Sequence, residues 1–124
     1  MTLLDDVYGA WMRGDIEGGL AHCTDDIFYR DQAVDHEAHG KEELAEWVHA
    51  GHAKVSDWKV EFETSFGDER HCAAEAKMTG VLIEEMAGKP ASDKPFFARY
   101  AIFGTITDGK LSRIMIYWNP AEWM

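Results

Sequence analysis

The stretch FFARYAIFGTITDGKLSRIMIYWN, residues 96–119, decides the fold class of this sequence. It is rich in β-branched and aromatic residues, and it contains Asp108-Gly109, a strong signal for a tight turn between antiparallel strands. The pattern predicts one strand over Phe96 to Thr107 and another over Leu111 to Asn119. An antiparallel sheet is therefore expected in the C-terminal part of the chain.

Two more strands are expected before this hairpin. In DWKVEFETSF, residues 57–66, apolar and polar side chains alternate, which is the pattern of a half-buried strand. The positions expected to face inward are Trp58, Val60, Phe62, Thr64 and Phe66. After a turn at GDER, a second long strand is expected over about His71 to Glu84, and the Gly- and Pro-rich residues 86–95 are expected to form a loop.

Three helices are expected in the N-terminal half. Apolar residues recur at helical spacing between Thr2, a candidate N-cap, and Gly14, and Asp15 can cap a shorter second helix. A third helix is expected after Gly40, in KEELAEWVHAGHAKV. Its apolar stripe consists of Leu44, Trp47, Val48, Gly51 and Val55. Helices ahead of long antiparallel strands indicate an α+β domain.

A short strand is expected between the second and third helices, in DDIFYRD, residues 25–31. Side chains alternate along a strand with period two, so Ile27, Tyr29 and Asp31 share one face. We expect a polar loop through His36 and His39 to follow.

Composition limits the function classes that are open. The chain has 124 residues, which suits one domain spanning 1–124, and 46% of them are hydrophobic. Its formal net charge of −11 would repel nucleic acid and anionic membrane surfaces alike, so neither is expected as a partner. The N-terminal residues lack the basic segment of a secretion signal, and no apolar run reaches membrane-spanning length. We therefore expect a soluble, cytoplasmic protein.

The order of three segments resembles a known family. RGDIEGGLAHCTDDIFYRD, then HGKEELAEWV, then TDGKLSRIMIYWN is similar to the small cone-shaped α+β proteins that include nuclear transport factor 2, ketosteroid isomerase and SnoaL-like polyketide cyclases. The resemblance implies three N-terminal helices packed on a strongly curved, mostly antiparallel sheet that encloses an apolar pocket. It also implies a homodimer. The same fold serves enzymes and binding proteins, so function has to be inferred from individual residues.

Asp31 is the main catalytic candidate, because the resemblance places it where ketosteroid isomerase has its general-base aspartate. That role needs a partly desolvated carboxylate, which takes a proton from a carbon next to a carbonyl. The alternative is that Asp31 accepts hydrogen bonds from loop amides at the end of its strand. Tyr8 or Tyr29 would donate a hydrogen bond to the substrate oxygen, although the pattern favours Tyr8 as an aromatic residue of the core whose hydroxyl reaches a partner.

Ala101 marks a departure from the isomerase pattern. Counted back from DGKL, it occupies the place of a second oxyanion donor, and alanine has no side-chain donor. Arg99 and Phe103 share the alternation face of Ala101 and are expected on the same pocket wall. Arg99 could bind a substrate oxyanion there or pair with a surface acid such as Glu75.

Further pocket walls are expected from the last strand and from the tryptophans. The resemblance matches Trp118 to a tryptophan that lines the isomerase pocket, and Ile116 shares its face. Trp47 and Trp58 are the other tryptophans expected to contact substrate. Such walls favour a hydrophobic small molecule that is flat or aromatic.

The histidines invite a metal site without completing one. His36 and His39 in HEAH lie in the predicted loop, and His49 and His52 lie three apart on the third helix. Neither pair has an identifiable set of remaining ligands, so we expect no metal and no cofactor.

The leading hypothesis is a small-molecule enzyme of the isomerase or cyclase type, which uses Asp31 as general acid or base on a hydrophobic carbonyl compound. The alternative is a non-catalytic ligand-binding or interaction module with the same fold. A third possibility, a dehydratase or epoxide hydrolase, needs a second acid or a histidine beside Asp31, and the sequence does not place one.

Overall fold

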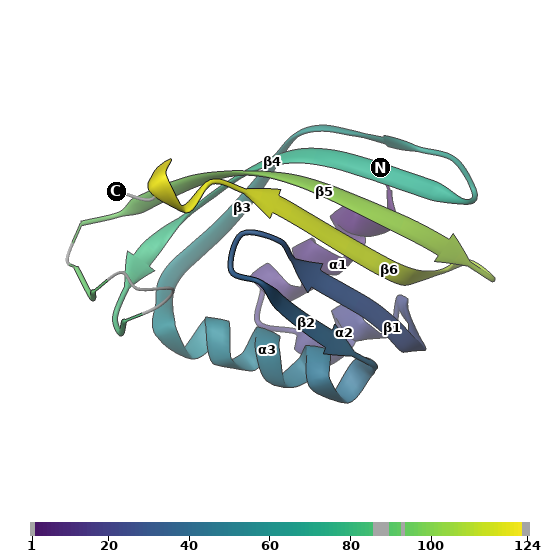
Figure 1. Ribbon diagram of the computed structural model, residues 1–124, viewed down its shortest axis with the longest axis horizontal. Helices are drawn as coiled ribbons and strands as arrows, with labels where there is room; N and C mark the ends of the chain where they lie inside the picture. Colours follow the sequence, from purple (N-terminus) through teal and green to yellow (C-terminus); the bar gives the residue numbers. More distant parts are fainter. Residues whose placement is uncertain (1, 86–89, 93, 123–124) are drawn as a thin grey trace.

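A computed structural model describes residues 2–85, 90–92 and 94–122 (Figure 1). Two short helices are followed by a β-hairpin, a third helix and four long strands. The helices are α1 (Leu3–Met12), α2 (Ile16–Leu20) and α3 (Lys41–Lys54), with a 3-10 turn η1 (Pro120–Glu122) after the last strand. The strands are β1 (Cys23–Asp31), β2 (His36–His39), β3 (Val55–Gly67), β4 (His71–Leu82), β5 (Phe96–Thr107) and β6 (Lys110–Trp118).

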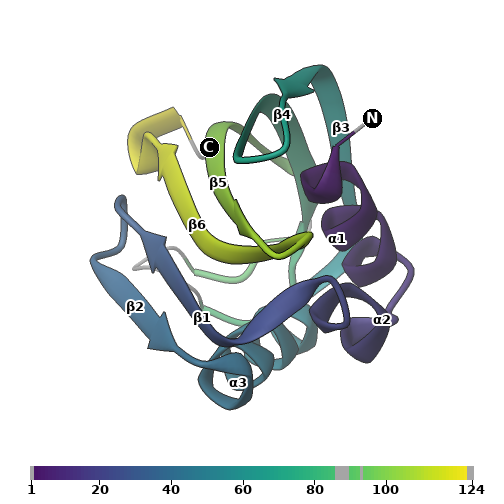
Figure 2. The same ribbon diagram turned by 90° about the vertical axis from the view of Figure 1, so that its right-hand side faces the viewer.

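All six strands form one sheet in the order β2-β1-β6-β5-β4-β3. Only the β1–β6 pair is parallel, and the other neighbours are antiparallel. Figure 2 shows the sheet strongly curved, with the helices on its concave side. The α+β prediction of a curved, mostly antiparallel sheet is confirmed. One detail differs, because α3 follows the β1–β2 hairpin and only α1 and α2 precede the sheet.

The predicted strands agree closely with the observed ones. β5 has the predicted bounds, β6 is displaced by one residue at each end, and β4 ends at Leu82 instead of Glu84. The predicted loop over residues 86–95 lies partly outside the described residues. The β5–β6 turn is built as expected, since Asp108 and Gly109 both have positive φ angles, 52° and 79°.

The segment HEAH is a strand, which corrects the prediction of a loop. β2 pairs with β1 in a register that sets His36 opposite Asp31 and His39 opposite Phe28. On the outer face of the hairpin, the guanidinium group of Arg30 donates hydrogen bonds to the carboxylates of Asp35 and Glu37. A four-residue strand is too short for its alternation to be read from sequence, and its pairing with β1 supplies the missing information.

The inward face of β3 is shorter than the alternation predicted. Val60 is buried, but Phe66 is 64% exposed. The register with β4 shifts between Phe62 and Thr64, and such a bulge reverses the face on which later side chains lie. Ser65 then turns towards α1, where its hydroxyl donates to Asp5 over 2.6 Å.

The core lies between the concave face of the sheet and the helices. Trp11 from α1, Ile27 from β1, Leu44 from α3 and Ile102 from β5 are all at most 2% exposed. Their side chains belong to one cluster of buried apolar residues. No helix in the described part of the chain is long and apolar enough to cross a membrane.

The convex face of the sheet exposes aromatic side chains. Phe103 is 50% exposed, Tyr117 is 41% exposed, and their rings meet edge to face at 5.8 Å. The homodimer stays a prediction, and this face is one exposed apolar surface for it. Light scattering is expected to give twice the 14.0 kDa mass of one chain, and the mass of a single chain would contradict it.

Candidate functional site

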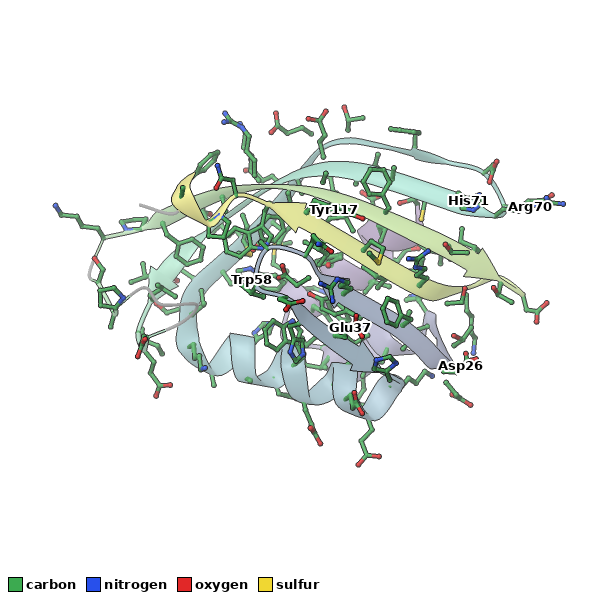
Figure 3. The ribbon with its side chains drawn as sticks, in the orientation of Figure 1. Asp26, Glu37, Trp58, Arg70, His71 and Tyr117 are labelled. Carbon is green, nitrogen blue, oxygen red and sulfur yellow. The ribbon has the colours of Figure 1, made fainter. Side chains whose placement is uncertain are left out.

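A cavity of about 330 Å³ lies between the concave face of the sheet and helices α1 and α3. Its walls contain seven tyrosine and tryptophan side chains: Tyr8, Trp11, Tyr29, Trp47, Trp58, Tyr100 and Trp118. Figure 3 shows Trp58 in the space between the sheet and α3, whereas Asp26 of β1 lies towards the right of the view, away from Trp58. A cavity of this size and lining suits a small, flat organic ligand.

Asp31 lies at the C-terminal end of β1, in the wall of this cavity. It is 6% exposed and is the only charged side chain that is buried among the described residues. Its Oδ1 accepts hydrogen bonds from Trp118 Nε1, at 2.8 Å, and from the backbone N–H of Ala33, at 3.1 Å. Asp31 thus accepts a hydrogen bond from a loop amide, as the structural hypothesis required. It also lines the cavity, as the general-base hypothesis required.

Burial raises the pKa of Asp31 above its ordinary value of 3.8. Hydrogen bonds from Trp118 and from the amides of Ala33 and Val34 oppose this rise, as does the charge of His36. No lysine or arginine forms an ion pair with Asp31 among the described residues. The group is therefore a desolvated carboxylate, as general-base chemistry requires.

The raised pKa predicts a pH-dependent cost to stability. The folded protein holds the Asp31 proton more tightly than the unfolded chain, so this contribution favours folding below about pH 4 and is lost as the pH rises through the folded-state pKa. The variant Asp31→Asn is therefore expected to be more stable than the parent near pH 7, with the gain disappearing near pH 3. Urea unfolding across this range measures it, and a gain that is independent of pH would contradict the assignment.

Three tyrosines surround the carboxylate. The hydroxyl of Tyr29 accepts a hydrogen bond from Trp47 Nε1 over 3.2 Å. Burial is the main cause that raises the pKa of Tyr8, Tyr29 and Tyr100, and the nearby Asp31 charge raises each further. All three hydroxyls therefore keep their protons at neutral pH and remain hydrogen-bond donors.

The Tyr8 hydroxyl is buried and has no hydrogen-bond partner among the described residues. The Tyr8 hydroxyl lies near the Tyr29 hydroxyl and opposes the rise in the pKa of Tyr29. The two hydroxyls nevertheless do not have the geometry of a hydrogen bond. A buried hydroxyl without a partner costs free energy, so a ligand oxygen in the cavity would satisfy it.

The structure corrects three predicted pocket residues. Arg99, Ala101 and Phe103 do not line the cavity. Arg99 lies over the ring of Phe97, with 5.1 Å between its Cζ and the ring centre, and Phe103 packs on Tyr117 of the convex face. The inward residues of β5 are the alternate ones, so the expectation that residues 99, 101 and 103 face the pocket was wrong.

Tyr100 is the residue of β5 that lines the cavity. It pairs with Trp118 across β5 and β6, and their ring centres lie 5.3 Å apart. A hydroxyl therefore occupies the wall where the sequence had suggested only Ala101. Ile102 and Gly104 are buried and lie on the same face as Tyr100. This alternation along β5 was the sequence signal that could have placed Tyr100 in the cavity.

The other predicted site residues line the cavity. They are Asp31, Tyr8, Tyr29, Trp47, Trp58, Ile116 and Trp118. His36 also lines it, and the sequence had not placed this histidine in the site. In residues 2–85, 90–92 and 94–122, no group of three or more His, Cys, Asp or Glu side chains is arranged to hold a metal ion.

Comparison with known proteins identifies the family. A model of the SnoaL-like domain matches residues 4–114. The chain belongs to the SnoaL-like domain family. Among proteins of curated function, none matches the sequence significantly.

Several solved structures share the fold of this SnoaL-like chain. A hypothetical protein with a ketosteroid isomerase-like fold from Catenulispora acidiphila, in complex with trimethylamine, superposes with a TM-score of 0.85 at 16% identity, covering 98% of this chain and 88% of its own. A candidate polyketide cyclase from Pseudomonas putida gives 0.80 at 23%, covering 98% and 92%. A candidate hydroxylase from Streptomyces galilaeus gives 0.79 at 19%, covering 95% and 86%. At these identities the likeness concerns the fold alone.

Proposed function

We propose that this SnoaL-like protein is a cofactor-independent enzyme that transfers a proton on a hydrophobic carbonyl compound, in an isomerase or cyclase type of reaction. The observation that supports this proposal most strongly is the buried carboxylate of Asp31 in the wall of an aromatic cavity, with its pKa raised by desolvation. Family membership among proteins related to cyclases and isomerases supports the proposal.

In the proposed reaction, Asp31 takes a proton from the carbon next to the carbonyl group and later returns it to another carbon. The hydrogen bonds that Asp31 accepts from Trp118 and from the Ala33 amide both go to Oδ1. Trp118 holds the carboxylate in place through its indole N–H. A carboxylate that is fixed in place and desolvated is a stronger proton acceptor than one in water.

Negative charge then develops on the substrate oxygen, which needs hydrogen-bond donors. The buried hydroxyl of Tyr8 is the first candidate, because it has no other partner among the described residues. Tyr29 and Tyr100 line the same cavity and keep their protons for the same reason of burial. Preorganised donors of this kind stabilise an enolate strongly in an apolar site.

Hydrogen–deuterium exchange tests this function without knowledge of the natural substrate. The probe is 2-tetralone, a flat bicyclic ketone, and its proton signal at carbon 1 is followed by NMR in D₂O. An enzyme of the proposed kind accelerates the loss of this signal above the buffer rate. No acceleration of exchange over buffer would overturn the proposal.

The second candidate function is binding without catalysis, with a small organic cation as ligand. The aromatic side chains around Asp31, which has no lysine or arginine partner among the described residues, favour it, since aromatic ring faces attract cations. The fold neighbour from Catenulispora acidiphila was solved with trimethylamine. Fluorescence titration with choline and with its neutral isostere 3,3-dimethylbutan-1-ol separates the two functions: a cation site binds choline about tenfold more tightly, whereas a carbonyl site does not prefer it.

A further inference from the structure

We propose that His36 is a second proton-transfer group in this cavity, and that the site removes water from a β-hydroxy carbonyl compound with Asp31 as base and His36 as acid. This inference rests on the proposed role of Asp31 and adds to it the substrate class and a further catalytic residue.

The β1–β2 hairpin places the two side chains together. His36 is the residue directly opposite Asp31 in the antiparallel register. Directly opposed residues point to the same face, with Cβ atoms about 4.5–5.5 Å apart. Both side chains line the cavity, and the charge of His36 acts on the Asp31 carboxyl group. The pair therefore faces a bound ligand from one corner of the cavity.

The imidazole ring is also held in position. It stacks on Trp47 of α3, with 3.7 Å between ring centres and 14° between planes. Trp47 in turn donates its indole N–H to Tyr29. A ring fixed by a stacked neighbour keeps its nitrogen atoms at the edge, where they can exchange protons with a ligand.

His52 is the other histidine of the cavity, but its surroundings differ. Its ring meets Trp58 edge to face at 4.9 Å, and its Nε2 is buried without a partner among the described residues. It belongs to α3 and is not opposed to Asp31 in any strand pair. His36 is therefore the better acid for a leaving group close to the carboxylate.

The proposed step balances without any added reagent. Asp31 removes the proton from the carbon between the carbonyl and the carbinol, and the electron pair of that C–H bond forms the new C=C bond. The C–O bond at the β carbon breaks, and its electron pair leaves with the oxygen, which takes a proton from the imidazolium of His36. Water and an α,β-unsaturated carbonyl compound result. The proton on Asp31 then replaces the one that His36 has lost, by way of solvent.

The test compares two reactions in the same variants. The elimination probe is 4-hydroxy-4-phenylbutan-2-one, whose product 4-phenylbut-3-en-2-one is followed by its ultraviolet absorbance, and the exchange probe is 2-tetralone. In His36→Gln we expect the ratio of elimination rate to exchange rate to fall about a hundredfold, since loss of a positioned acid typically costs that much. His36→Phe retains the stack on Trp47 but has no proton to give, so it should show the same fall.

His39→Gln is the matched control. His39 lies on the same strand but on the outer face, 64% exposed and in contact with Glu37, so its replacement should leave both rates unchanged. If the parent exchanges 2-tetralone but eliminates no water, or if both His36 variants keep the parental ratio, the role of His36 is overturned while that of Asp31 stands. If the parent exchanges neither probe, the proposed function itself fails and the inference fails with it.

Discussion

We expect Asp31→Asn to lower the rate of 2-tetralone exchange by about a hundredfold to ten-thousandfold, the range typical for removal of a general base. Asparagine has nearly the same shape and keeps an oxygen that can accept from Trp118 and Ala33, so the cavity should persist. What it loses is the ability to take a proton. NMR measurement of exchange, with fluorescence titration of 2-tetralone to show that binding is retained, checks this result.

Asp26→Asn is the control for this change. Asp26 lies on the same strand and is exposed, away from the cavity (Figure 3). The substitution removes one negative charge from the same strand, so it corrects for any general effect of net charge. Equal exchange rates in the parent and in Asp31→Asn would show that Asp31 is a structural acceptor for the loop and would favour the binding module.

The second large effect is expected from Tyr8→Phe, in opposite directions for stability and activity. Removing a buried hydroxyl that lacks a partner should raise the free energy of unfolding by about 1 kcal/mol or more. The same change removes a donor to the developing oxyanion and should slow exchange by about a hundredfold to a thousandfold. Urea unfolding and 2-tetralone exchange measure the two effects on one sample.

Tyr117→Phe serves as the reference for this experiment. Tyr117 is 41% exposed on the convex face, so loss of its hydroxyl should change neither stability nor exchange appreciably. A Tyr8→Phe variant that is less stable than the parent would show that the hydroxyl has a partner after all. One that keeps the parental exchange rate would remove Tyr8 from the proposed site.

The sheet was predictable because its strands carry strong local signals. β5 and β6 flank an Asp-Gly turn, and their bounds followed from it within one residue. The bulge in β3 was not predictable, because a shift of register depends on the partner strand β4. The hairpin strand β2 was missed for the same reason, since four residues give too little alternation without β1 beside them.

The candidate site was predicted where a residue lies close to a recognisable motif. Asp31 and Trp118 lie at the ends of strands with clear alternation, and both reach the cavity. Ala101 was expected on the pocket wall by counting back from DGKL, but it lies on the outer face of β5, and Tyr100 on the inner face was not predicted. His36 could not be placed, because its position opposite Asp31 follows from a strand pairing that the sequence did not reveal.

Titration of the Asp31 carboxyl carbon by ¹³C NMR tests the central claim most directly. The resonance is assigned by its absence from Asp31→Asn. A desolvated carboxylate in the cavity wall predicts a midpoint above the ordinary 3.8, which moves upward again in Trp118→Phe because the indole hydrogen bond that lowers the pKa is then lost. A midpoint at or below 3.8 would show a solvated or fully satisfied carboxylate and would contradict its role as the base.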